Sequence, residues 1–173
     1  MKASEVLAFL PLLIYGIAIA ELFSQWKRFI NYKKLYIPYA LITVMLTEVA
    51  LYNVYLFSQL VSEISMIDYR TYFIYIIPPF IFMIGVNIFT PEKEDETETY
   101  FKENMPVFFI LMAFFIASHF FFRYEESGSV LLGRIILIVW FLLTGILRKI
   151  WMVYVIIALW LLMLMTRFSL INY

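Results

Sequence analysis

Six polar side chains lie inside otherwise apolar stretches of this chain, and their types suit proton or ion chemistry. Glutamate and histidine bind and release protons, arginine is a fixed cation, and asparagine holds either kind of partner by hydrogen bonds. They are spread along most of the sequence, so any site must be assembled by elements that bring distant residues together. The six are Glu21, Glu48, Asn53, Asn87, His119 and Arg134.

Composition excludes several other chemistries. Cysteine is absent and histidine occurs once, at His119, which excludes thiol catalysis, disulfides and a multi-histidine metal site within one chain. Ser118 precedes His119, but adjacent helical residues point about 100° apart, and the sequence has no hydrolase nucleophile motif. The net charge of zero gives no basic field for nucleic acid. We therefore expect no metal, no cofactor and no nucleic-acid partner, and we assign no catalytic residue.

The elements that position these residues are predicted to be membrane-spanning helices. Hydrophobic residues make up 64% of the 173 residues and charged residues 15%, whereas soluble domains are about half apolar and a quarter charged. A spanning helix needs about 20 mostly apolar residues. The sequence predicts an all-α, polytopic membrane bundle that forms a single domain over 1–173 and contacts membrane lipids. Six spans are expected, at 6–25, 36–60, 72–89, 106–122, 130–147 and 150–166.

The first span could be a cleaved signal peptide or a helix, and the last two spans could be one long helix or a hairpin. The first span resembles a secretory signal peptide, but Glu5 interrupts its positively charged start, so we expect it to be an uncleaved helix. Only Arg148 and Lys149 separate the fifth span from the sixth. One continuous helix of that length would far exceed a bilayer core of about 30 Å. A tight hairpin is therefore predicted there.

The basic residues predict an orientation. Eight of them lie in the first, third and fifth connections and four on the opposite side, so the first set should be cytoplasmic and both termini outside. The third connection, 90–105, is then an acidic cytoplasmic loop. Thr90, Pro91 and Glu92 have the features of a helix start. The segment is expected to form a short amphipathic helix, a solvated acidic linker or a divalent-cation site.

Counting from the span centres, at about 1.5 Å per residue, places the six polar residues at three depths. Glu48 lies at the centre; Glu21 and Asn87 lie about 7 Å towards the cytoplasm, and Asn53, His119 and Arg134 about 7 Å the other way. A charge at the bilayer centre costs roughly 2.5–3.5 kcal/mol, so Glu48 must face the bundle. It is either ionised and paired with Arg134 or His119, or protonated because it is desolvated.

Pro78 and Pro79 fall near the middle of the third span. Proline removes backbone hydrogen bonds and predicts a helix kink at this point. Interrupted helices at this depth bind cargo in many transporters, and they also occur as plain kinks.

Two segments resemble a group of small bacterial membrane proteins with six helices. The stretch YGIAIAELFSQWKRF, at 15–29, is similar to the first-helix signature of that group, and ETETYFKENMPVFFILMAFF, at 96–115, to its acidic and aromatic entry to the fourth helix. The resemblance implies a fold and a location in a bacterial inner membrane, and it implies no activity. The matching positions are Glu21, Leu22, Trp26, Lys27, Arg28, Tyr100 and Phe101.

Three classes of function remain open. The first is proton or small-ion transport, with Glu48 as the central group, Glu21 as an inner relay, and His119 with Arg134 as an outer relay. It is expected to act as a homo-oligomer, packed through small residues such as Gly16 and Ala20. The second is a structural or accessory protein that binds a membrane-protein partner through its helices and acidic loop. The third is a lipid-modifying enzyme, which would need a lipid pocket beside His119.

Overall fold

The computed structural model describes residues 3–30, 35–63, 68–92, 97–121 and 128–170. All of the regular structure in these ranges is helical. The helices are α1 (Ala3–Trp26), followed by the short 3-10 helix η1 (Lys27–Phe29), α2 (Ile37–Glu63), α3 (Tyr69–Phe89), α4 (Thr97–Ser118), continued by the 3-10 helix η4 (His119–Phe121), α5 (Gly128–Leu147) and α6 (Ile150–Leu170). The prediction of an all-α chain is confirmed.

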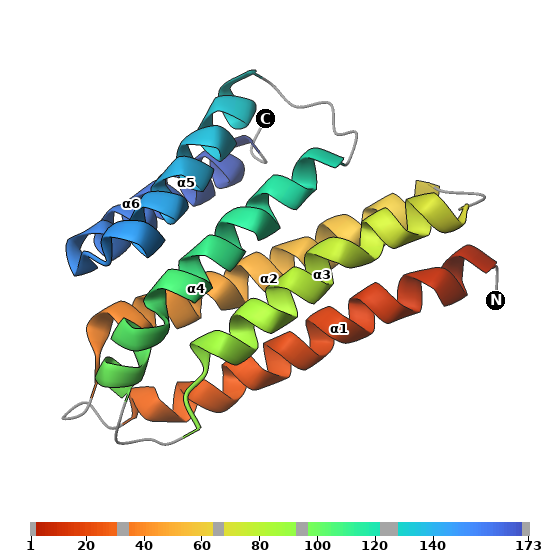
Figure 1. Cartoon of the computed structure of the whole chain (residues 1–173). Helices are drawn as coiled ribbons and strands as arrows, with labels where there is room; N and C mark the ends of the chain where they lie inside the picture. Colours follow the sequence, from red (N-terminus) through yellow and green to blue (C-terminus); the bar gives the residue numbers. More distant parts are fainter. Residues whose placement is uncertain (1–2, 31–34, 64–67, 93–96, 122–127, 171–173) are drawn as a thin grey trace.

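The helices pack in three layers (Figure 1). α2 and α4 form the middle layer, α1 and α3 cover one side of it, and α5 and α6 cover the other. α2 contacts α1 and α6, while α4 contacts α3 and α5. Each middle helix therefore touches both outer layers, and residues of α2 and α4 can build sites on either side.

Among the described residues, four helices are long and apolar enough to cross a membrane, and they cover Phe9–Phe29, Ile37–Gln59, Tyr69–Phe89 and Thr97–Phe121. The apolar parts of α5 and α6, Leu131–Leu147 and Ile150–Met165, are shorter. Many large apolar side chains point outward, among them Phe9, Ile17, Leu51, Phe114 and Leu162. Soluble monomers rarely expose so much apolar surface, so this exterior is compatible with insertion into lipid.

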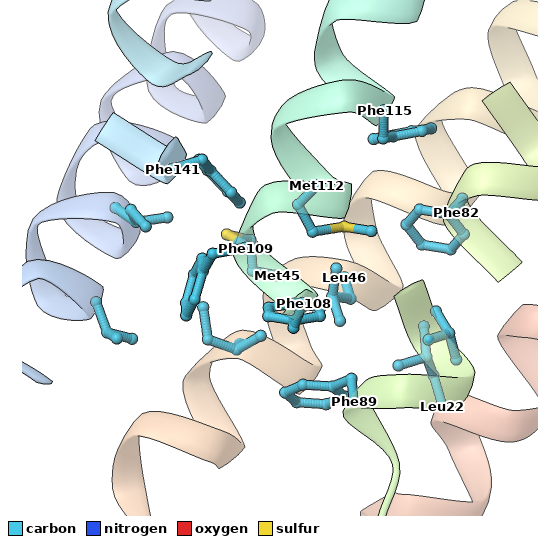
Figure 2. Packing of buried hydrophobic residues seen from close by; sticks show 14 of the residues in the cluster. Leu22, Met45, Leu46, Phe82, Phe89, Phe108, Phe109, Met112, Phe115 and Phe141 are labelled. Carbon is cyan, nitrogen blue, oxygen red and sulfur yellow. The ribbon is translucent and has the colours of Figure 1, made fainter. Parts of the chain in front are cut away.

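A layer of aromatic rings fills one half of the bundle (Figure 2). Phe89 of α3 lies 5.0 Å from Phe108 of α4, Phe108 lies 4.9 Å from Phe109, and Phe109 lies 5.6 Å from Phe141 of α5, measured between ring centroids. All four side chains are buried. Such pairs add about 0.5–1.5 kcal/mol each beyond the burial of their area. We call these four residues the aromatic layer; it packs α3, α4 and α5 against one another.

Two glycines allow α4 to approach its neighbours closely. A Cβ atom on Gly145 of α5 would lie 3.0 Å from the backbone oxygen of Pro106 and 3.2 Å from Cγ1 of Ile110. A Cβ on Gly85 of α3 would overlap the end of the Met112 side chain. The lack of a side chain at Gly145 therefore lets α5 approach the backbone of α4, whereas at Gly85 the flexible end of Met112 fills the space.

The predicted hairpin between the last two spans is confirmed. α5 ends at Leu147, α6 begins at Ile150, and the two helices pack together. Arg148 turns the chain with a φ of 54°, and its backbone N–H donates to the carbonyl of Thr144 at 3.0 Å. Arg148 thus ends the helix with left-handed backbone angles, a conformation that glycine adopts at most helix ends of this kind.

The expected helix start at Thr90 is wrong. Thr90 is the residue that ends α3, where its backbone N–H donates to the carbonyl of Val86. The next helix begins at Thr97, so 97–105 of the acidic segment forms the first turns of α4. Glu98 and Lys102 pair across one turn there at 2.6 Å, which favours helix in a segment with many charges.

Candidate functional site

A cavity of about 130 Å³ lies between α2, α4, α5 and α6, on the far side of the aromatic layer from η1. It is partly open to the surroundings. Most of its wall is apolar, and three methionines contribute to it. The lining residues are Met45, Leu46, Val49, Tyr52, Asn53, Leu56, Met112, Phe115, Ile116, His119, Arg134, Leu137, Phe141, Ile156, Trp160 and Met163.

The structure brings three of the predicted site residues to this cavity. Asn53, His119 and Arg134 come from α2, from η4 at the end of α4, and from α5. They meet because these helices run side by side and the three residues lie at similar depths in them. A lipid-modifying enzyme would need a pocket beside His119, and the cavity lies beside this residue.

His119 is held by hydrogen-bond partners on both ring nitrogens. Nδ1 lies 2.8 Å from the backbone oxygen of Phe115, and Nε2 lies 2.7 Å from Oδ1 of Asn53. The amide of Asn53 is itself oriented, because its Nδ2 donates to the backbone oxygen of Val49 at 2.8 Å. Asn53 therefore presents its oxygen to the imidazole, and both atoms that face the ring are hydrogen-bond acceptors.

Ser118 does not form a catalytic pair with His119. Its hydroxyl donates to the backbone oxygen of Phe115 at 2.6 Å, the same oxygen that Nδ1 of His119 contacts. The two side chains thus share a backbone partner. This arrangement gives no support to nucleophilic catalysis at Ser118.

Arg134 brings a fixed positive charge to the cavity. Its guanidinium carbon lies 5.7 Å from the centroid of the Phe120 ring, which follows His119 in η4. A cation over an aromatic face is attracted by about 0.5–2 kcal/mol. This contact helps to hold α5 beside the end of α4.

Glu48 lies at the side of this site and is bound by a residue that the sequence analysis missed. The indole N–H of Trp160, in α6, donates to Oε2 of Glu48 at 2.8 Å. Trp160 also lines the cavity, so the same side chain contacts both the cavity and Glu48. A tryptophan in the middle of an apolar helix was the available signal, because a buried indole N–H needs an acceptor.

A second, smaller hollow lies on the other side of the pair formed by His119 and Asn53. It encloses about 10 Å³, and its other lining residues are Tyr15, Leu56, Phe57, Tyr75, Pro78 and Pro79. Both prolines are buried within α3, which continues as a helix through them. The pair of His119 and Asn53 thus separates a larger hollow facing α5 and α6 from a smaller one facing α1 and α3.

Besides Glu48, which lies beside the cavity without lining it, two more of the predicted site residues do not reach it. Asn87 is exposed near the end of α3. Glu21 is half-buried in α1, where its carboxylate accepts from Nε2 of Gln25 at 3.3 Å. The buried hydroxyl of Tyr39 donates to Oε1 of the same Gln25 at 3.1 Å. Glu21 therefore belongs to a separate polar group near η1.

Contacts near η1 connect the two segments that carry the family resemblance. Arg28 donates to Oγ1 of Thr97 at 2.9 Å and to the backbone oxygen of Pro91 at 2.8 Å. The Tyr39 ring stacks on Phe89 at 4.5 Å and meets Phe101 edge-on at 6.3 Å. The Arg28 contacts join η1 to the start of α4, and the Tyr39 ring joins α2 to α3 and α4. In the acidic segment, residues 93–96 lie outside the described ranges, so the candidate cation site falls partly there.

The fold and the cavity together define an all-helical chain that has helices able to span a membrane and, among its helices, a largely apolar cavity lined in part by Asn53, His119 and Arg134. No protein-family model matches the sequence, and no curated protein or solved structure shows significant similarity to it.

Proposed function

We propose that this chain is a six-span protein of a bacterial inner membrane that binds and transfers protons at the cavity between α2, α4, α5 and α6. The single observation that carries the proposal is the ring of His119, which lies between two acceptor oxygens. The resemblance to small bacterial six-helix proteins supports the membrane and the number of spans.

The geometry around His119 offers an acceptor oxygen to each of its ring nitrogens. A neutral imidazole has one N–H and can donate to only one of its two acceptors. Asn53 cannot turn its amide to donate instead without breaking its bond to the carbonyl of Val49. A second proton on His119 therefore gains a partner that is already in place.

Glu48 is the second proton-binding group in this proposal. Its carboxylate accepts from Trp160, a cavity-lining residue, so a small movement of the indole would connect it to the cavity. Beyond Glu48, the aromatic layer packs α3, α4 and α5 against one another. Transfer across the whole membrane therefore requires a second conformation in which this layer opens.

The test is proton flux into liposomes that contain the purified protein. A pH-sensitive dye inside the vesicles reports acidification when a membrane potential is imposed. We expect flux above that of empty vesicles, and a loss of at least tenfold in His119→Gln and in Glu48→Gln, because glutamine cannot carry the proton. Asn87→Ala is the matched control, since Asn87 is exposed and outside the cavity. It should transport at the wild-type rate.

Two results would refute the proposal. One is wild-type flux equal to that of empty vesicles, and the other is normal flux in both glutamine variants. Thermal unfolding of each variant in detergent separates loss of flux from loss of fold.

A structural or accessory role is the second candidate, and the bond between Glu48 and Trp160 favours it. This bond ties the middle layer to α6, and interhelical hydrogen bonds of this kind stabilise membrane bundles by about 1 kcal/mol. In that case, Glu48→Gln unfolds at a lower temperature than wild type while neither protein conducts protons.

A further inference from the structure

The wall of the cavity is polar at one end and apolar at the other. Three helices pass from one end to the other in about two turns, or roughly 10 Å: α4 from Met112 to His119, α5 from Phe141 to Arg134, and α6 from Ile156 to Met163. His119 and Arg134 lie at the same end as Asn53, whereas Met112, Phe141 and Ile156 lie at the other. The cavity thus has the polarity pattern of a ligand with a polar head and an apolar tail.

The volume limits how large this ligand can be. A dry cavity of about 150 Å³ in another protein holds one benzene molecule, so roughly six carbon atoms fit in a space of this size. The cavity here encloses about 130 Å³ and is partly open. An acyl chain with about six enclosed carbon atoms matches this volume, and a complete phospholipid does not. Methionine side chains at Met45, Met112 and Met163 add tolerance, because they are flexible and polarizable.

The side chains at the polar end of the cavity determine which ligand head group can bind there. Arg134 supplies a permanent cation whose planar donors match a carboxylate. Tyr52, on α2, adds a phenol to the same wall. The acid nearest to the cavity is Glu48, and the Trp160 indole holds one of its carboxylate oxygens. The head that fits this end is a single anionic group that accepts hydrogen bonds.

We propose that the cavity between α2, α4, α5 and α6 binds a medium-chain fatty acid, with its carboxylate at Arg134 and its acyl chain between Met112, Phe141 and Ile156. The fatty acid reaches the site from the surrounding lipid, in which its chain is soluble. This site does not depend on proton transfer, because a fatty acid can bind whether or not protons move through the protein.

Trp160 provides the measurement, because its indole lies in the wall of the cavity. The probe is 8-bromooctanoate, whose bromine quenches tryptophan fluorescence at short range, added to the protein in nanodiscs at about pH 7.5, where the carboxylate is ionised. The comparison ligand is 8-bromooctanol, which has the same chain and no charge. We expect saturable quenching by the acid and at least tenfold weaker binding of the alcohol. Trp160→Phe should remove the saturable component.

Variants of the arginine test the head group. Arg134→Gln should weaken binding of the acid about tenfold and leave binding of the alcohol unchanged, whereas Arg134→Lys should keep most of the affinity for the acid. Arg70→Gln is the matched control, because Arg70 is exposed at the start of α3. If Arg134→Gln does not fold, the preference for the acid over the alcohol in wild type and in Arg134→Lys still tests the proposal.

Two outcomes would overturn the proposal. Quenching that rises linearly and equally for acid and alcohol would mean partition into lipid only. Saturable binding of both ligands with equal affinity would mean an apolar cavity that does not recognise the anion. Neither outcome depends on proton flux, so failure here leaves the proposed proton transfer to its own test.

Discussion

Two alanine substitutions in α5 give a direct test of how α4 and α5 pack. Gly145 and Gly133 lie in the same helix, so Gly→Ala brings the same gain in helix propensity, about 1 kcal/mol, at both positions. They differ in what the new Cβ meets. At Gly145 it would lie 3.0 Å from the backbone oxygen of Pro106, whereas at Gly133 there is nothing within 4 Å.

The propensity term cancels when the two variants are compared, which leaves the cost of the contact at Gly145. A backbone oxygen in a helix cannot move aside as a flexible side chain can, and overpacking of this kind costs about 1–3 kcal/mol. Gly145→Ala should therefore be less stable than Gly133→Ala by about 1–3 kcal/mol, which corresponds to about 2–4 °C in Tm for each kcal/mol.

The measurement is thermal unfolding by circular dichroism in one detergent, with both variants and wild type at the same protein concentration. Gly133→Ala should unfold at or slightly above the wild-type temperature. Equal stability of the two alanine variants would refute the reasoning, because it would mean that α5 does not approach α4 at Gly145 as closely as described.

Three further predictions concern hydrogen bonds and helix ends. In a double-mutant cycle of Glu48→Gln and Trp160→Phe, the coupling free energy should be about 1–2 kcal/mol, and additive effects would mean that the two side chains do not interact. Arg148→Gly should be more stable than Arg148→Ala by about 1 kcal/mol in thermal unfolding, because both remove the cation but only glycine adopts a φ of 54° without strain. At the start of α3, hydrogen bonds from Thr71 hold the pKa of the Asp68 carboxyl below its ordinary value. The stabilisation by Asp68 is therefore complete above the ordinary pKa of about 4 and is lost as the pH falls through the lower pKa of the folded protein. Asp68→Asn, which still accepts that bond, should remove this acid-dependent loss, and an unchanged pH profile would contradict the assignment.

Much of the fold was predictable because apolar stretches separated by charged segments mark helices of spanning length. The turn at Arg148 and Lys149 followed from the same reasoning, since two charged residues cannot remain in the middle of a long apolar helix. The start of α4 at Thr97 was not predicted, because this segment is not apolar. Its first turns, from Thr97, are rich in charge and resemble a loop in hydropathy, although Glu98 and Lys102 are spaced to pair on a helix.

The sequence predicted the level of the site residues along their helices, but not which face of each helix they occupy. Counting along the spans placed Asn53 and His119 at one level, and the structure joins them at 2.7 Å. The same count placed Asn87 in the polar pathway, whereas it is exposed. Helices that are apolar on every side carry no periodic pattern to show which face is inward. Trp160 was missed because tryptophan counts as apolar in composition, although its N–H requires an acceptor.

The bond between Glu48 and Trp160 also has a consequence for biosynthesis. Glu48 is made with the second helix, and its indole donor arrives only with the sixth, 112 positions later in the chain. During synthesis, this acid is therefore made long before its indole donor exists. A chain that stops after α5 would keep the Glu48 carboxyl without the Trp160 donor, a feature by which quality-control proteases could tell an incomplete copy from a finished one.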